Sequence, residues 1–130
     1  MEEDELFKRI DHVEIIPSNI DKTIDFYTNI LGFKIKERFR VDRPPLAEIA
    51  FLQLNDSMIE LLSFKNASPP AVAPQVGFRM MAIEVDDMDK TIAYLDTKGV
   101  KITNGPRLMG KSKRAEIKDP DGLAIELRQW

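Results

Sequence analysis

The sequence predicts an α+β fold of two tandem βαβββ modules, which form a curved mixed sheet with a concave site and helices on the outer face. An internal repeat is the first observation behind this prediction. Residues 21–24, 32–35 and 59–61 recur in the same order as residues 89–92, 99–102 and 125–127, at offsets of 68, 67 and 66. The second observation is that each copy shows the same succession of strand, helix and strand patterns. The modules cover about residues 8–64 and 77–130, joined by a linker at about 65–76 that contains three prolines.

Each copy opens with an alternating strand, at residues 10–16 and 78–85. The following helices are expected to be capped by Ser18 and by Asp86, each with an acid three positions later. Apolar residues then recur at helical spacing, and Gly32 and Gly99 stand where a helix ends in the left-handed conformation. The apolar positions are Ile20, Ile24, Tyr27 and Leu31 in the first helix, and Met88, Ile92 and Leu95 in the second.

A strand pair closes each copy. The pairs are residues 48–54 with 58–63, and residues 114–118 with 123–128, the latter around the turn sequence DPDG. A basic segment precedes the second pair and contains Arg107, Lys111, Lys113 and Arg114 among glycines and a proline. We expect this segment to be a solvated loop; the functional alternative is a mobile flap that meets an anionic small molecule.

Composition excludes several classes of function. The 130 residues are 43% hydrophobic and 32% charged, as in ordinary globular domains, and no apolar run is long enough to cross a bilayer. The net charge of −3 does not favour nucleic-acid binding. Cysteine is absent, which excludes disulfides, zinc–thiolate sites and a cysteine nucleophile. The acidic N-terminus, residues 1–5, is unlike a signal or transit peptide, so we expect a cytoplasmic protein with no membrane partner.

Strand alternation sorts the side chains of the modules between two faces. The helix-facing positions are consistently apolar: Val13, Ile15, Ile59, Leu61, Met81, Ile83, Val85, Ile125 and Leu127. The opposite face carries His12, the only histidine, and Glu14 on the same strand, together with Glu60 and its repeat mate Glu126. Two carboxylates in one partly desolvated hollow repel each other, so a divalent metal or the nearby Arg128 would have to supply positive charge. Taken singly, His12 is as readily a core or surface residue, and each glutamate could lie on a solvated sheet face.

Several of these motifs together resemble the vicinal-oxygen-chelate superfamily, which includes glyoxalases, bleomycin resistance proteins and extradiol dioxygenases. They are residues 12–15 (HVEI), 24–28 (IDFYT) with 31–33 (LGF), 82–87 (AIEVDD), 119–122 (DPDG) and 125–127 (IEL). The resemblance covers the chain after about residue 8. It implies the two-module fold, and a divalent metal held by up to four side chains, which the substrate chelates through adjacent oxygens.

Carried over by position, the resemblance implies that His12, Glu60 and Glu126 are metal ligands. The third ligand position is Met80, where the family usually has His, Gln or Glu. A thioether is a soft ligand that suits oxygen-rich sites poorly, so metal affinity should be reduced. The loss is also compatible with a pocket that binds an organic ligand without metal.

The ligand set and the motifs resemble most the lactoylglutathione lyase (glyoxalase I) members of the superfamily. This implies a metal-dependent lyase or isomerase acting on a small substrate with adjacent oxygens, through an enediolate-type intermediate. Glu126 or Glu60 would move the proton between adjacent carbons, and the cofactor would be Ni, Co, Zn, Mn or Mg. The alternatives are a metal-independent binding or resistance protein of the bleomycin-resistance type, and a methylmalonyl-CoA epimerase-like isomerase. A homodimer is expected, with the site built by one chain or shared by two.

Overall fold

The computed structural model describes residues 6–130, and the chain divides between Ala67 and Ser68 into two compact units. Each unit has the predicted βαβββ order of elements, which confirms the α+β class and the tandem modules. The acidic segment at residues 1–5, on which the expectation about targeting rests, lies outside the described residues. No helix within residues 6–130 is both long and apolar enough to cross a membrane.

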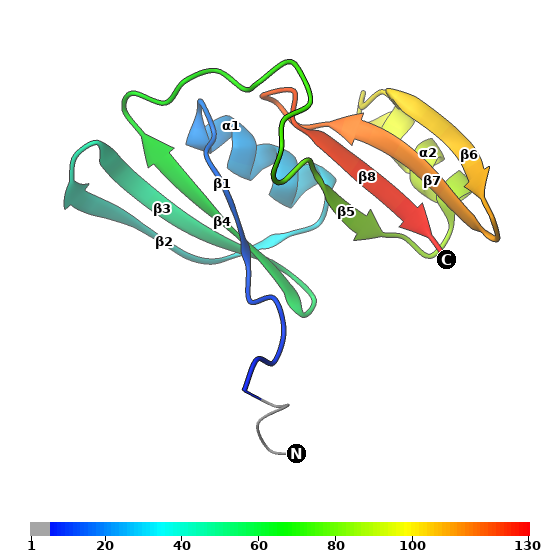
Figure 1. Cartoon of the computed structure of the whole chain (residues 1–130), viewed down its shortest axis with the longest axis horizontal. Coiled ribbons are helices and arrows are strands. Elements are labelled where there is room, and N and C mark those ends of the chain that lie inside the picture. The colour runs from blue at the N-terminus through cyan, green and yellow to red at the C-terminus, as the bar shows by residue number, and fades with distance from the viewer. Residues whose placement is uncertain (1–5) are drawn as a thin grey trace. The chain divides into compact units, whose positions relative to one another are not determined.

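The first unit is a four-stranded mixed sheet with the strand order β1-β4-β3-β2 (Figure 1). The strands are β1 (Val13–Ile15), β2 (Lys34–Arg43), β3 (Leu46–Leu54) and β4 (Ser57–Phe64). β1 runs parallel to β4, whereas β4 with β3 and β3 with β2 are antiparallel. The first and last strands of the module are therefore neighbours, and side chains far apart in the sequence meet across them.

The helix of the first unit changes its winding halfway. α1 (Ile20–Asp25) continues as a π-helix, η2 (Phe26–Ile30), in which the backbone N–H of Leu31 donates to the carbonyl of Phe26 five residues earlier. Two consecutive aromatic residues of η2, Phe26 and Tyr27, are both buried in the core. Their rings meet edge to face at 5.4 Å.

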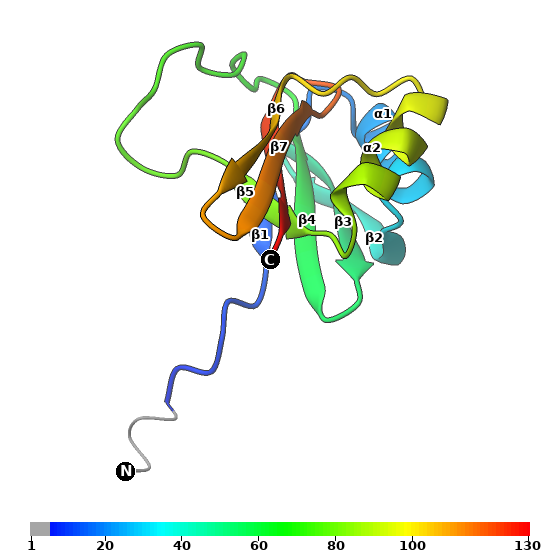
Figure 2. The ribbon, with the colours of Figure 1, turned by 90° about the vertical axis from the view of Figure 1, so that its right-hand side faces the viewer.

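The second unit repeats this plan. Its elements are β5 (Met81–Glu84), α2 (Met88–Thr97), β6 (Asn104–Met109), β7 (Ser112–Lys118) and β8 (Ala124–Gln129), and its sheet order is β5-β8-β7-β6. Figure 2 shows α2 lying along one face of this sheet. β5 is parallel to β8, and β7 lies antiparallel between β8 and β6.

The core of each unit forms between its helix and its last strand. α1 contacts β4 and α2 contacts β8, and the apolar residues on either side of each glutamate are buried. These residues are Ile59 and Leu61 on β4, and Ile125 and Leu127 on β8. The predicted helix-facing side is confirmed for the last strands, whereas Val13 on the short β1 stays 43% exposed.

Two local predictions are wrong. The helix caps are Asn19 and Asp87, one residue later than predicted, since their side chains accept the backbone N–H groups of Lys22 and Lys90. In each case two short polar residues are adjacent in the sequence, and the extended backbone at the second one decides which of them caps. The basic segment is also not a loop, because most of it forms the β6–β7 hairpin and Arg114 is buried.

Candidate metal centre

The imidazole of His12 and the carboxylate of Glu60 meet across the first and last strands of the first unit. His12 immediately precedes β1 and Glu60 lies in the middle of β4. The Nε2 atom of His12 is 3.1 Å from Oε1 of Glu60. Glu60 is 8% exposed although it is charged, because buried residues flank it on its strand. The sequence prediction that these two residues share one face is therefore confirmed.

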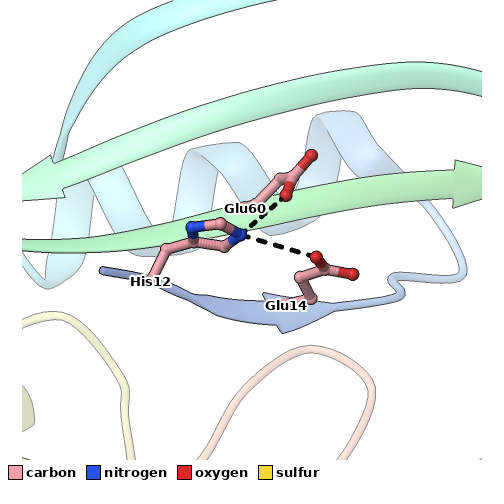
Figure 3. A group of neighbouring side chains, drawn as sticks. All are labelled: His12, Glu14 and Glu60. Atoms are coloured by element: carbon pink, nitrogen blue, oxygen red, sulfur yellow. Dashed lines mark hydrogen bonds and ion pairs between the residues drawn. The ribbon is translucent and has the colours of Figure 1, made fainter. Parts of the chain in front are cut away.

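Glu14 joins the same cluster. It is paired with Glu60 in the parallel register of β1 and β4, and its Oε2 atom lies 3.4 Å from Nε2 of His12. Figure 3 shows the imidazole pointing towards both carboxylates. One ligand atom from each of His12, Glu14 and Glu60 lies within 4.8 Å of the others, a spacing that a single cation can bridge after small side-chain rotations.

Two further residues hold the imidazole in place. Its Nδ1–H donates to the carboxylate of Asp11 at 2.9 Å, which leaves Nε2 facing the glutamates. A histidine that ligates a metal commonly donates its other ring nitrogen to a carboxylate in this way. The ring of Phe51, on β3, stands edge to face with the imidazole at 5.8 Å and gives the cluster an apolar wall.

The charges of the cluster are not balanced. Burial raises the pKa of Glu60 above its usual value, and the carboxylate of Glu14 raises it further, while His12 partly opposes the shift. The hydrogen bond with Asp11 raises the pKa of His12. Within residues 6–130, no lysine or arginine forms an ion pair with Glu14 or Glu60. A cation would therefore be stabilised here by two carboxylates that otherwise repel each other.

The donor set fits a divalent metal. One imidazole nitrogen and carboxylate oxygens are ligands of zinc and of other first-row divalent ions. Glu60 is buried and Glu14 is exposed, so the Glu14 side of the cluster is in contact with solvent. These residues can accordingly hold a divalent ion.

Glu126, the third predicted ligand, lies on β8 of the second unit in different surroundings. Its Oε1 atom accepts hydrogen bonds from Nε and Nη2 of Arg114, at 3.0 and 2.8 Å. Its Oε2 atom accepts Nε of Arg128 at 3.0 Å, and Nη2 of Arg128 lies 2.9 Å away. Burial opposes ionisation of Glu126, but the hydrogen bonds and charges of Arg114 and Arg128 outweigh it and lower the pKa of Glu126. The prediction that Arg128 could balance this carboxylate is confirmed.

Met80 occupies the position in the second unit that His12 occupies in the first. It immediately precedes β5, as His12 immediately precedes β1, and it is half-buried. The residue two positions later is Ala82, which is paired with Glu126 as Glu14 is paired with Glu60. The second unit therefore lacks two of the three donors that form the cluster in the first.

Four residues that shape these sites were not among the predicted site residues: Glu14, Asp11, Arg114 and Glu116. Alternation placed Glu14 on the face of His12, so the spacing of two residues was a usable signal for a further ligand. Arg114 and Glu116 share a face of β7 by the same rule, and Nη2 of Arg114 lies 2.6 Å from Oε2 of Glu116. The pairing of Arg114 with Glu116 was not predicted, because the basic, glycine-containing segment around Arg114 favoured a loop. No sequence signal identified Asp11.

Known proteins resemble this chain over nearly its whole length. The family model described as the Glyoxalase/Bleomycin resistance protein/Dioxygenase superfamily matches residues 9–127. An uncharacterized Bacillus subtilis (strain 168) protein, YwkD, is 37% identical over 94% of this chain and 97% of its own length. The crystal structure of the glyoxalase family protein from Enterococcus faecalis is 28% identical, has a TM-score of 0.83, and is matched over 95% of this chain and 98% of its own.

Two similar proteins carry the name of an enzyme. The lactoylglutathione lyase of Neisseria meningitidis serogroup A is 29% identical over 93% of this chain and 90% of its own length. The probable chloroplastic lactoylglutathione lyase of Arabidopsis thaliana is 33% identical over 92% of this chain, which spans only 35% of the plant protein. The match of the family model across both modules shows that the chain belongs to the glyoxalase/bleomycin resistance protein/dioxygenase superfamily.

Proposed function

We propose that this protein is a metal-dependent lyase or isomerase of the glyoxalase I type, which acts on a small substrate with adjacent oxygens. The observation that carries the proposal is the meeting of His12 Nε2 and the buried Glu60 carboxylate at 3.1 Å. Relatives named lactoylglutathione lyase that match nearly all of this chain support the same reading.

In this proposal His12 and Glu60 bind a divalent ion. The bound ion would supply positive charge that polarises neighbouring oxygens of the substrate. Asp11 orients the imidazole so that Nε2 faces the site, and Phe51 shields one side of the ring from water. Glu60 is partly buried and lies beside a second carboxylate, so it binds a cation more strongly than a solvated glutamate does.

We assign proton transfer between adjacent carbons of the substrate to Glu126, as the family resemblance implies. Arg114 and Arg128 keep this carboxylate ionised and fix both of its oxygens. Because these contacts lower the pKa of Glu126 and weaken it as a base, one guanidinium contact has to open before a carboxylate oxygen accepts the proton. To ligate a metal, Glu126 would have to give up contacts with at least one of the two guanidinium groups.

The arrangement around Met80 favours a second candidate, a metal-independent protein that binds a small organic molecule. Met80 stands in place of a ligand, and the charge of Glu126 is already balanced by arginine. A flexible thioether side chain is a good wall for an apolar ligand. We rank this candidate second because no lysine or arginine among the described residues pairs with the carboxylates of Glu14 and Glu60.

Metal content and turnover test the proposal together. The protein is purified without chelator, Ni, Co, Zn, Mn and Mg are measured, and methylglyoxal is assayed with several thiols. We expect stoichiometric metal and metal-dependent turnover, both strongly reduced in Glu60→Gln but not in the control Glu37→Gln, an exposed glutamate on β2. A protein that stays metal-free in excess Ni²⁺, Co²⁺, Zn²⁺ and Mn²⁺, yet binds an organic ligand, would establish the second candidate instead.

A further inference from the structure

The two modules place different residues around equivalent glutamates. Glu60 and Glu126 occupy the same register position, each paired on one side with the opening strand and on the other with the preceding strand of its sheet. On the opening strand the partner is Glu14 in the first module and Ala82 in the second. The repeat that relates the modules therefore supplies an internal comparison of how each one balances a buried carboxylate.

The modules also differ on the strand that precedes the glutamate's own strand, which is β3 in the first module and β7 in the second. There the second module is the one with charged residues. Phe51 is paired with Glu60, whereas Glu116 is paired with Glu126. The neighbouring pair is Ile49 with Leu62 in the first module, and Arg114 with Arg128 in the second. The first module is thus apolar on this side of its glutamate, and the second carries two guanidinium groups there.

These differences between equivalent positions of the two modules set the net charge around each glutamate. In the second module Glu116 and Glu126 carry two negative charges, and Arg114 and Arg128 carry two positive charges, with N–O distances between 2.6 and 2.9 Å. The first module has three carboxylates around one imidazole: Asp11 lies against Nδ1 of His12, and Glu14 and Glu60 lie against Nε2, where the imidazole would ligate a metal as the neutral ring. Among the described residues, no lysine or arginine pairs with the two carboxylates on the Nε2 side, and one divalent cation would neutralise their two negative charges.

We infer that Glu14 is a metal ligand and that the first module alone, through His12, Glu14 and Glu60, holds the divalent ion, while Glu126 is not a ligand. This inference rests on the proposed function and assigns its ligands. Glu14 takes the role that Met80 cannot fill, because its oxygen lies 3.4 Å from His12 Nε2 on the same strand segment. Arg114 and Arg128 hold both oxygens of Glu126 in the second module, so this carboxylate has its positive partners without a metal.

Metal affinity of the full chain tests the ligand assignment. The protein is stripped with chelator and titrated with Co²⁺, by calorimetry and by visible absorption, which reports the coordination of the bound ion. Loss of a ligand should weaken Co²⁺ binding by about tenfold or more in Glu14→Gln. Glu126→Gln should bind Co²⁺ with an affinity within about twofold of the starting protein and with the same spectrum, because its partners are guanidinium groups. Glu84→Gln, an exposed glutamate on β5, is the matched control.

The possible results separate the inference from the proposed function. If the starting protein binds no Co²⁺, both fail. If it binds Co²⁺ and Glu14→Gln binds equally well, or if Glu126→Gln loses affinity as Glu14→Gln does, the inference is overturned while the metal-dependent function stands. A marked gain of Co²⁺ affinity in Met80→His would likewise overturn it, because the metal would then lie where that position can reach. Glu14 is exposed, so thermal unfolding of the metal-free Glu14→Gln variant should match that of the starting protein.

Discussion

The turn between β7 and β8 offers a quantitative test of what stabilises the start of β8, the strand that carries Glu126. The carboxylate of Asp119 is buried, and its Oδ1 atom accepts the backbone N–H groups of Asp121 and Leu123 at 2.9 and 3.0 Å. The same turn is closed by the backbone N–H of Asp119, which donates to the carbonyl of Leu123. Replacing Asp119 by Ala would leave two backbone donors without their acceptor at the point where β8 begins.

The size of the effect follows from these bonds. A hydrogen bond to a charged group contributes about 1.5–3 kcal/mol, so two such bonds set an upper range of roughly 3–6 kcal/mol. Water can reach the turn at the exposed Pro120 and Gly122 and compensate part of the loss, so we expect Asp119→Ala to lower the free energy of unfolding by about 2–3 kcal/mol. For a chain of this size that corresponds to a fall in Tm of roughly 8–12 °C.

Chemical and thermal denaturation followed by circular dichroism measure this loss. Asp119→Asn keeps an oxygen acceptor and should cost only about 1 kcal/mol. Asp56→Ala changes the exposed side chain of the corresponding turn in the first module, and should stay within about 0.5 kcal/mol. An Asp119→Ala protein as stable as the Asp56→Ala control, or an Asp119→Asn protein as unstable as Asp119→Ala, would refute the reasoning.

Two further substitutions test local features of the fold by the same measurement. Asp87→Ala removes the cap of α2 and should cost about 1 kcal/mol, whereas the adjacent Asp86→Ala should stay within about 0.5 kcal/mol; equal losses would mean that Asp87 is not the cap. Gly110→Ala forces an alanine into a positive-φ conformation and should cost about 1–2 kcal/mol. Gly105→Ala should cost clearly more, because its added Cβ would also lie 2.8 Å from the carbonyl oxygen of Arg114; a smaller loss than in Gly110→Ala would contradict this.

The sequence alone determined the architecture, because the repeat and the strand and helix periods are properties of the chain itself. The alternation around Ile59 and Leu61 predicted which face of β4 contributes apolar side chains to the core, and its recurrence around Ile125 and Leu127 extended this to β8. Local ambiguity limited the detail. Two adjacent polar residues can each cap a helix, and only the backbone conformation selects Asn19 and Asp87.

The composition of the candidate site was decided by tertiary structure. The parallel pairing of β1 with β4 brings Glu14 opposite Glu60, and a register is a relation between two strands that a period of two within one strand does not specify. The antiparallel pairing of β7 with β8 brings Arg114 beside Glu126, although its neighbours in the sequence suggested a solvated loop. Charge balance depends on such cross-strand neighbours, since electrostatic interactions are set by distance in space and by burial. The sequence therefore identified His12, Glu60 and Glu126 as candidates. The fold showed that His12 and Glu60 lie beside Glu14, a carboxylate without a basic partner among the described residues. It also showed that Arg114 and Arg128 hold Glu126.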